Sequence, residues 1–396
     1  MLQIADRMNT LGTETAFEVL ARANALAAQG KSIINLGIGQ PDFATPDHIV
    51  EAGRKALADG HHGYTPANGI LPLREAVVAD LHRRHRVEVS PEDVLVVPGG
   101  KVTMFFAIMI FGEPGVEIMY PNPGFPIYES VIRFSGATPV PMPLYESAGF
   151  SFSAEEVLSK ITPRTRLIII NTPANPTGGV VPKSELDKLV RGLSDHPQVA
   201  VMSDEIYGEI LYDGAEHWSL LRYPEIRDRV ILLDGWSKTY AMTGWRLGYG
   251  VWPKQLLPHA EKLAINCHSC VNAATQFAGI AALTGPRDPV ERMVKAFAER
   301  RTYIVEALNS LPGVRCANPG GAFYTFPNVA GTGYDAKTLQ TELLDQAGVA
   351  TIAGTSFGAF GEDYIRISYA NSLENLREAV ERIRRFLGNL PRGGAR

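Results

Sequence analysis

The stretch DGWSKTYAMTGWRLGYG, residues 234–250, holds a single lysine, Lys238, among aromatic and glycine residues. Burying a lysine is costly because its ammonium group loses hydration, so most lysines lie in water. Two interpretations are open: a strand end whose lysine points to solvent, or a site where a buried lysine carries out chemistry. The residues on either side of the stretch decide between them.

Short apolar, β-branched runs alternate with amphipathic runs on both sides of this stretch. The runs expected to form strands are residues 93–99, 116–121, 137–144, 166–171, 198–205, 229–235 and 246–252. The runs expected to form helices are residues 46–59, 70–85, 101–112, 126–136, 153–161 and 183–196. Ser153 is expected to cap its helix, with Glu156 at the capping-box position. Because apolar strands alternate with helices, we expect an α/β fold with a mostly parallel sheet flanked by helices.

The alternating block predicts a large domain over residues 46–285. After it, a long helix is expected at residues 288–311. Short strands and a final helix follow at residues 322–329, 349–354, 364–370 and 372–390. The helical pattern at residues 18–30 can pack with either domain. We assign residues 1–45 and 286–396 together to a smaller α+β domain.

The composition excludes several classes of protein. The chain has 396 residues, of which 45% are hydrophobic and 20% charged, as is typical of a globular protein with a large core. Its net charge of −4 provides no bulk attraction to nucleic acid or anionic lipid. No apolar run approaches the roughly 18 residues of a membrane span, and the first residues lack a signal-peptide pattern.

Cysteine usage points to a reducing compartment. Cys267, Cys270 and Cys316 are too few for a disulfide framework in a chain of this size. The motif CHSC, residues 267–270, lacks a second group of Cys or His residues to complete a zinc site. We therefore expect a cytoplasmic protein with no metal, no nucleic-acid partner and no membrane segment.

Polar, glycine and aromatic residues follow the expected strands at the points where they end. They are Gly99, Gly100, Lys101, Phe125, Asn175, Asp204, Tyr207, Ser237 and Lys238, with Arg246 just before the last strand. Ligands of open α/β sheets bind at the carboxyl ends of the strands, so these residues are expected to share one site. A Gly-Gly helix start, a hydroxyl and a guanidinium suit a phosphate, and an aspartate suits a protonated ring nitrogen. Asparagine and tyrosine suit a phenolate and lysine suits an aldehyde, and these four groups together are those of pyridoxal 5′-phosphate.

Several motifs resemble those of the class I/II, fold-type I aminotransferases. They are SKTYAMTGWRLGYG (237–250), NTPANPTGG (171–179), SDEIYGEILYDG (203–214), GIGQPDF (37–43), GYTPANGILPLREA (63–76), PGGKVTMFFA (98–107), YPNPGFPIY (120–128), GGAFYTF (320–326) and YIRISYA (364–370). The motifs occur in the family's order, and the resemblance covers nearly the whole chain. It implies a homodimeric enzyme that depends on pyridoxal 5′-phosphate, with a large domain and a smaller α+β domain.

The resemblance also implies roles for the residues that would hold the cofactor ring. Lys238 would carry the cofactor as a Schiff base and, once released by substrate, would move the proton at the substrate Cα. Asp204 would keep the ring nitrogen protonated, and Phe125 would stack on the ring. Tyr207 and Asn175 would bind the phenolate oxygen, with the Asn175–Pro176 peptide expected to be cis.

Further roles concern the phosphate and the substrate. The groups implied to hold the phosphate are the backbone of Gly100, Lys101 and Val102 with the side chains of Ser237 and Arg246. Arg366 would bind the substrate α-carboxylate with two hydrogen bonds, helped by Asn175 and the Gly39 backbone. Tyr64 would reach the phosphate of the neighbouring subunit's cofactor. The resemblance assigns no role to His268 and Asn272.

The reaction implied is transfer of an amino group from an L-amino acid to a 2-oxo acid by a ping-pong route. The family favours aspartate or glutamate with 2-oxoglutarate, while aromatic, alanine and methionine substrates stay open. Because a fold does not fix a function, β-elimination of the C–S lyase type and a biosynthetic cyclase reaction are alternatives. A cofactor-binding regulator is disfavoured, because the chain has no basic region and no added DNA-binding segment.

Overall fold

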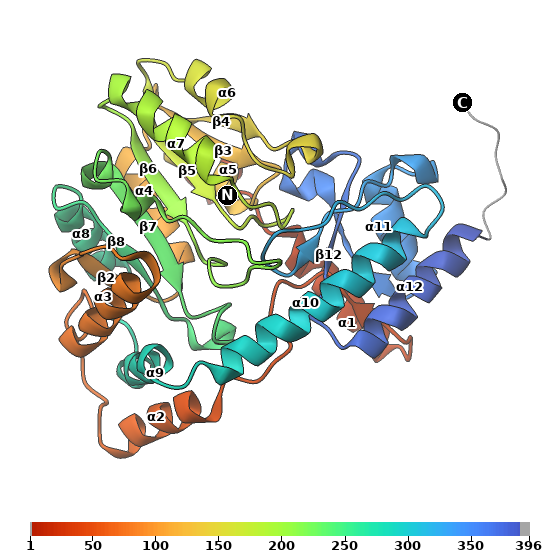
Figure 1. The fold of residues 1–396 in the computed structure, drawn as a ribbon, viewed down its shortest axis with the longest axis horizontal. Helices are drawn as coiled ribbons and strands as arrows, with labels where there is room; N and C mark the ends of the chain where they lie inside the picture. The colour runs from red at the N-terminus through yellow and green to blue at the C-terminus, as the bar shows by residue number, and fades with distance from the viewer. Residues whose placement is uncertain (1, 389–396) are drawn as a thin grey trace.

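The structure is a computed structural model that describes residues 2–388, and Figure 1 shows two parts with the long helix α10 running between them. The larger part contains a seven-stranded sheet in the order β2-β8-β7-β6-β5-β3-β4. Its strands are β2 (Val94–Val97), β3 (Glu117–Asn122), β4 (Thr138–Pro143), β5 (Thr165–Asn171), β6 (Ala200–Asp204), β7 (Val230–Gly235) and β8 (Gly248–Val251). Strand β8 runs antiparallel to both its neighbours, and the other pairs are parallel. The expected α/β fold with a mostly parallel sheet is confirmed.

Helices cover both faces of this sheet. They are α2 (Asp47–Ala58), α3 (Leu71–His85), α4 (Lys101–Phe111), α5 (Ile127–Ser135), α6 (Ala154–Ser159), α7 (Lys183–Gly192), α8 (Leu257–His268) and α9 (Ala273–Thr284). Alternate strand residues divide between two cores: Leu95 and Val97 pack with α4, α5 and α8, whereas Val94 and Val96 pack with α3, α6, α7 and α9. Two-sided burial explains why these strands are solidly apolar.

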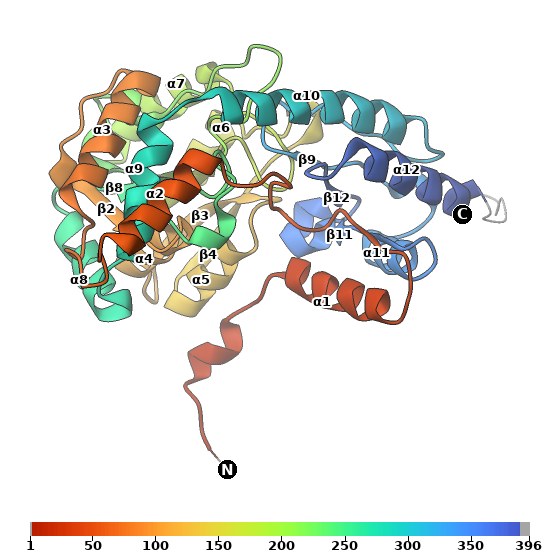
Figure 2. The same ribbon diagram turned by 90° about the horizontal axis from the view of Figure 1, so that it is seen from below.

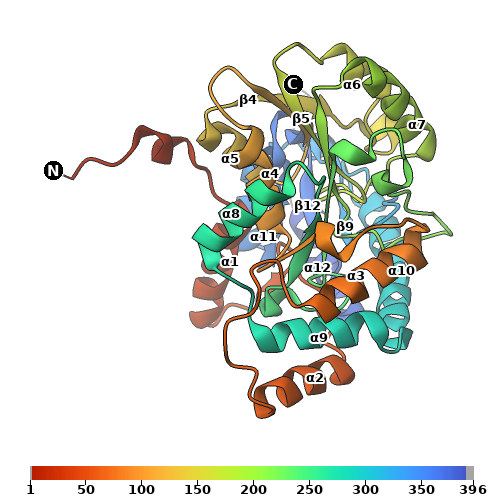
Figure 3. The same cartoon turned by 90° about the vertical axis from the view of Figure 1, so that its left-hand side faces the viewer.

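Two helices of the large part were not identified by the sequence pattern. Helix α9 is rich in alanine and is buried nearly all round, so it lacks the polar stripe that marks an amphipathic helix. It packs against α2, as Figure 3 shows, and against α3. Helix α8 begins with a proline near its first turn and ends at His268. The Ser153 cap of α6 is confirmed, since its hydroxyl accepts from the Glu156 N–H at 3.3 Å.

The smaller part combines elements that precede the large part in the sequence with elements that follow it. Its elements are α1 (Thr15–Ala28), β1 (Ile34–Asn35), α10 (Asp288–Asn309), β9 (Tyr324–Thr325), α11 (Ala336–Asp345), β10 (Val349–Ala350), β11 (Ile352–Ala353), β12 (Ile365–Ser368) and α12 (Leu373–Gly388). Strands β11, β12 and β9 form an antiparallel sheet, and β1 pairs in parallel with β10. These pairings support the proposed division into a domain of residues 46–285 and one of residues 1–45 with 286–396. Positions 389–390 of the expected last helix lie outside the described residues.

Helix α1 lies against the smaller part, and the chain before it runs outward toward the N-terminus (Figure 2). It contacts β10 and β11, while the short 3-10 helix at Asp6–Thr10 packs against α5. The segment between these contacts therefore passes from one part of the molecule to the other. Within residues 2–388, no helix is both long enough and apolar enough to cross a membrane.

Candidate active site

A cavity of about 630 Å³ lies at the carboxyl edge of the seven-stranded sheet. The predicted site residues that line it are Gly39, Gly100, Lys101, Phe125, Asn175, Asp204, Tyr207, Ser237, Lys238, Arg246 and Arg366. Val102 and Tyr64 are not among the lining residues. The structure thus gathers most of the predicted site into one cavity.

Strand pairing explains why these residues meet. Asp204 ends β6, and its register partner on the parallel neighbour β5 is Asn171, which also lines the cavity. Strand β7 ends at Gly235, so Ser237 and Lys238 emerge at the same edge. Because β8 runs antiparallel to β7, its first residues lie at this edge too and bring Arg246 beside them.

Lys238 is half-buried in the cavity wall. Its Nζ donates to the Gly39 carbonyl oxygen at 2.5 Å and lies 5.7 Å from the ring centre of Tyr207. Burial, together with the nearby Arg366 guanidinium, lowers the pKa of Lys238 to about 8. A fraction of the amine is therefore neutral near physiological pH, and the neutral form is the one that acts as a nucleophile or base.

Asp204 presents its carboxylate to the same cavity. The Tyr128 hydroxyl donates to Oδ2 at 2.6 Å, and the Ile206 N–H donates to Oδ1 at 3.3 Å. Burial raises the pKa of Asp204 to about 6, although the Tyr128 hydrogen bond opposes this shift. A cation placed beside this carboxylate would stabilise its ionised form.

Arg366 lies on β12, opposite the large sheet, and is only 4% exposed. Its Nη1 donates to Asn175 Oδ1 at 2.9 Å and its Nη2 to the Gly37 carbonyl oxygen at 2.5 Å. Its Nε has no hydrogen-bond partner among the described residues. The Gly37 carbonyl thus holds this arginine, and Gly39, the expected backbone contact of the substrate, lines the same cavity. The guanidinium offers a buried, incompletely satisfied fork of the kind that binds carboxylates.

The remaining predicted ring contacts lie nearby. The Tyr207 and Tyr324 hydroxyls are 2.8 Å apart, and burial raises the pKa of Tyr207 well above its usual value. The Phe125 ring meets the Tyr128 ring edge to face at 5.7 Å. The Asn175–Pro176 peptide is cis, as expected from the sequence.

A cradle for an anion lies at the start of α4. Gly99 has φ +95°, and a Cβ there would overlap the Arg246 guanidinium, so only glycine fits. The Val102 N–H is already used, since it donates to the Gly99 carbonyl at 3.0 Å. The N–H groups of Gly100 and Lys101 have no acceptor in the described part of the chain. Together with Ser237 and Arg246, they form a set of donors suited to a phosphate.

Other predicted residues lie toward the outer surface. Tyr64 is 93% exposed, and Arg246 is exposed on its outer side. Beside Arg246 a second hollow, of about 740 Å³, is lined in part by His268 and Asn272. Asn272 caps α9 by accepting from the Thr275 N–H at 2.9 Å, which gives it a structural role. The His268 ring stacks on Phe106.

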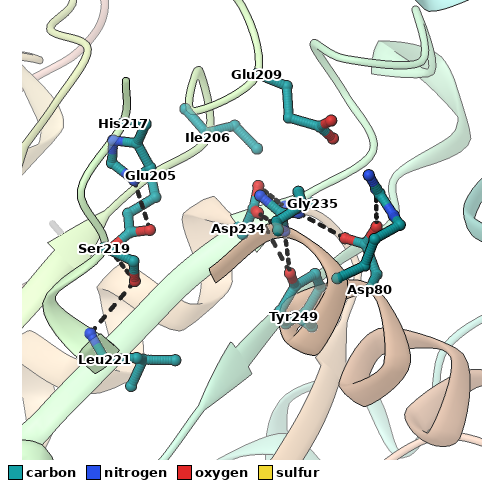
Figure 4. Close-up of polar contacts among 12 residues, drawn as sticks. Asp80, Glu205, Ile206, Glu209, His217, Ser219, Leu221, Asp234, Gly235 and Tyr249 are labelled. Atoms are coloured by element: carbon teal, nitrogen blue, oxygen red, sulfur yellow. Dashed lines mark hydrogen bonds and ion pairs between the residues drawn. The ribbon is translucent and has the colours of Figure 1, made fainter. Parts of the chain in front are cut away.

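A buried polar network supports the sheet behind the cavity. Glu205 follows Asp204 but does not line the cavity, and its carboxylate points toward His217 and Ser219 (Figure 4). It accepts from His217 Nε2 at 2.7 Å and Ser219 Oγ at 2.9 Å. Burial opposes ionisation of Glu205, but His217, His85 and the Ser203 hydroxyl together outweigh it and lower the pKa of Glu205 to about 2. Adjacent residues thus divide into one acid for the site and one for the core.

Asp234, near the end of β7, is the centre of a second buried polar cluster. Its Oδ2 accepts from Arg84 Nη2 at 2.8 Å and from the Tyr249 hydroxyl at 3.2 Å, and its Oδ1 accepts from the Gly235 N–H at 2.7 Å. Figure 4 shows Asp234 beside Tyr249 and Gly235. These bonds fix the strand end from which the Lys238 loop departs.

The donor set fits pyridoxal 5′-phosphate. The cradle at Gly99 and Gly100 suits the phosphate, Asp204 suits the ring nitrogen, and Lys238 suits the aldehyde. The Phe125 ring lines the same cavity and suits the flat face of the ring. The unpartnered Nε of Arg366 leaves a donor for a substrate carboxylate.

Tyr128, Tyr324 and Glu14 are among the cavity residues that the sequence analysis did not predict. Tyr128 lies in the first turn of α5, three positions after Phe125, which precedes the helix. Tyr324 lies in the GGAFYTF motif, which carried no assigned role. Glu14 precedes α1 in a segment with no strand-end signal, and only the folded chain brings it to the cavity.

Comparison with known proteins agrees with this geometry. The model of the family "Aminotransferase class I and II" matches residues 31–383. An aspartate aminotransferase of Geobacillus stearothermophilus is 37% identical over 392 residues, covering 98% of this chain and 99% of that protein. The aspartate aminotransferase structure from Rhizobium meliloti has a TM-score of 0.94 at 33% identity, covering 99% of this chain and 100% of that one. An aromatic aminotransferase structure from Pyrococcus horikoshii has a TM-score of 0.87 at 36% identity, covering 92% and 98%.

Proposed function

The chain belongs to the class I and II aminotransferases and is a pyridoxal-phosphate-dependent enzyme, and from this we propose that it moves the amino group of an L-amino acid to a 2-oxo acid by a ping-pong route. We propose aspartate or glutamate as the donor and 2-oxoglutarate as the acceptor. The observation that carries the proposal is the meeting of Lys238, Asp204 and Arg366 in one cavity.

Each of these side chains has a defined task in the proposed reaction. Arg366 binds the α-carboxylate and so fixes the substrate Cα relative to Lys238. Asp204 holds the proton at the ring nitrogen, and the bound cofactor then supplies an electron sink for the bond that breaks at Cα. Lys238 Nζ, whose pKa burial lowers to about 8, takes up and returns the Cα proton.

The proposed acidic substrates need a second cation in the cavity besides Arg366. Lys101 supports this choice, because its side chain lines the cavity. The names of the relatives from Geobacillus stearothermophilus and Rhizobium meliloti support it as well. A bound dicarboxylate would place one carboxylate at Arg366 and the other toward Lys101.

We also propose a cytoplasmic homodimer. Tyr64 and Arg246 are exposed beside the second hollow, which supports a partner subunit covering this face. The three free cysteines are compatible with a reducing compartment. Light scattering during size-exclusion chromatography would measure the mass of the protein in solution. A mass equal to that of one chain would contradict the dimer.

The test of the reaction is an absorption spectrum of the cofactor-loaded protein before and after adding one L-amino acid without any 2-oxo acid. With aspartate or glutamate, we expect the cofactor absorbance to change and one equivalent of 2-oxo acid to be released. Adding 2-oxoglutarate should then restore the first spectrum. The Lys238→Ala variant should lose at least about 10²-fold in rate, whereas Lys254→Ala, at an exposed lysine, should behave as wild type.

The same experiment distinguishes the alternative reactions. Release of ammonia without any acceptor would indicate β-elimination, and a new cyclic product would indicate a cyclase. An unchanged spectrum with every amino acid would contradict transamination altogether.

A further inference from the structure

A carboxylate that the proposed reaction does not use faces the substrate cavity. Glu14 lines the same cavity as Lys238 and Arg366, and its side chain is only 16% exposed. Its carboxylate forms an ion pair with the ammonium group of Lys101, which also lines the cavity. The cation that is available for a second substrate carboxylate is thus already paired with the protein's own acid.

Glu14 is carried by a segment that is tied down on both sides of it. Before it, the Gly12 N–H donates to Ser130 Oγ on α5 at 2.8 Å. After it, Arg22 on α1 forms an ion pair with Asp345 at the end of α11 at 2.5 Å. The Glu14 backbone is therefore held between the two parts of the molecule, whereas its side chain makes no helix-capping hydrogen bond and is free to change partner.

The negative charge of Glu14 affects the pKa values of two other side chains of the site, Lys238 and Arg366. Burial lowers the pKa of Lys238, and Glu14 partly offsets this effect. Burial likewise lowers the pKa of Arg366, and Glu14 is one of the charges that oppose the shift. A negative charge this close to both residues also repels a second carboxylate on a bound substrate.

A ping-pong enzyme must accept two different side chains in one cavity. We propose that Glu14 is a specificity-determining residue: paired with Lys101 it lets the cavity accept uncharged side chains, and it gives up Lys101 to the side-chain carboxylate of an acidic substrate. The inference rests on the proposed function, since it assumes that amino acids and 2-oxo acids bind between Arg366 and Lys238. It adds uncharged substrates to the acidic substrates proposed above, in the same cavity.

The substitution Glu14→Gln removes the charge and keeps the size of the side chain. Because the Glu14 side chain caps no helix, the substitution leaves the fold intact. The matched control is Glu18→Gln, which removes a charge from an exposed position of the same helix that does not line the cavity. A second variant, Lys101→Gln, removes the other member of the pair.

The experiment measures dissociation constants of succinate and of its monoamide, succinamate, for the cofactor-loaded proteins by titration calorimetry. Glu14→Gln should bind succinate about fivefold more tightly than wild type, because an unpaired ammonium then meets the second carboxylate. Its affinity for succinamate should change less than twofold. Lys101→Gln should bind succinate more weakly, and Glu18→Gln should match wild type for both ligands.

Equal shifts for succinate and succinamate, or no shift in Glu14→Gln, would overturn the proposal. A kinetic readout accompanies the binding data: the KM for 2-oxoglutarate should fall in Glu14→Gln. Failure of the proposed function is recognised separately, because wild-type protein would then show no spectral change with any amino acid. This inference alone is overturned if the wild-type protein transaminates but Glu14→Gln leaves the ratio of the dissociation constants for succinate and succinamate unchanged.

Discussion

The Tyr128 hydroxyl donates a hydrogen bond of 2.6 Å to Oδ2 of Asp204, and both side chains line the active-site cavity. Tyr128 comes from α5 and Asp204 from the end of β6, so the bond joins a helix to the sheet edge. The hydroxyl stabilises the ionised carboxylate against the effect of burial, which raises the pKa of Asp204 to about 6. Tyr128 is therefore a positioning residue for the acid that would hold the ring nitrogen.

Replacing Tyr128 by phenylalanine should weaken cofactor binding. Without the donor the pKa of Asp204 rises further, and the carboxylate is less often ionised at neutral pH. A hydrogen bond to a charged group contributes about 1.5–3 kcal/mol, so the dissociation constant of pyridoxal 5′-phosphate should rise roughly tenfold or more. Titration of the cofactor-free protein, followed by absorbance, measures it.

The matched control is Tyr223→Phe, because the Tyr223 hydroxyl also donates to an aspartate, Asp187, at 2.6 Å but outside the cavity. This variant should bind the cofactor as wild type does. Equal affinities for Tyr128→Phe and wild type would remove Tyr128 from its positioning role.

Replacing Arg366 by lysine should weaken substrate binding. The guanidinium is held by Asn175 and Gly37 so that its fork faces the cavity, and an ammonium group cannot reproduce this geometry. The loss of one charge-assisted hydrogen bond predicts a KM for amino acids that is at least about tenfold higher. Arg301→Lys, at a second buried arginine outside the cavity, should leave KM unchanged. An unchanged KM in Arg366→Lys would exclude this residue from carboxylate binding.

Replacing Lys238 by methionine should stabilise the cofactor-free protein in a pH-dependent way. Burial lowers the pKa of Lys238 from 10.5 to about 8, so the charged form is less favourable in the folded than in the unfolded state. This destabilisation is fully present below pH 8 and is lost as the pH rises from 8 to 10.5. At pH 7 the variant should therefore melt a few degrees higher than wild type.

Calorimetric melting curves between pH 7 and pH 10.5 measure this difference. The gap between Lys238→Met and wild type should narrow steadily over that range, whereas the exposed Lys254→Met should show no such trend. A difference in melting temperature that stays constant with pH would mean that burial does not disfavour the charged form of Lys238.

Replacing Glu205 by glutamine should destabilise the fold without impairing chemistry directly. The substitution breaks the buried ion pair with His217, and the estimated loss is about 2 kcal/mol or more in the free energy of unfolding. Since Glu205 faces away from the cavity, kcat of the folded protein should stay within about twofold. Urea unfolding measures the first quantity, and Glu216→Gln, at an exposed position, is the control. A large fall in kcat at unchanged stability would contradict the division of tasks between Asp204 and Glu205.

Much of the large part was predictable because its local signals agree with its tertiary structure. Every expected strand of the seven-stranded sheet is present, since burial on both faces demands continuous apolar runs. The antiparallel direction of β8 could not be predicted from its apolar run, because parallel and antiparallel strands share the same side-chain period. Helix α9 was missed because its burial removes the amphipathic pattern.

The candidate site also contains some residues that were predictable from the sequence and others that were not. Residues at strand ends, such as Asp204 and Lys238, were predictable because the carboxyl edge of a sheet gathers them. Glu14 and Tyr324 were not, because their place in the cavity depends on contacts between segments far apart in the chain. The pairing of Glu14 with Lys101, 87 positions later, is visible only after folding.

The pairing of β1 with β10 has a consequence for how the chain matures on the ribosome. Ile34 pairs with Val349, so β1 leaves the ribosome about 315 residues before its partner. At a synthesis rate of about 5–20 residues per second, the N-terminal segment waits roughly 15–60 s for that partner. Arg366, which lines the active-site cavity, is synthesised later still, so the cavity of a newly made chain is complete only after that interval.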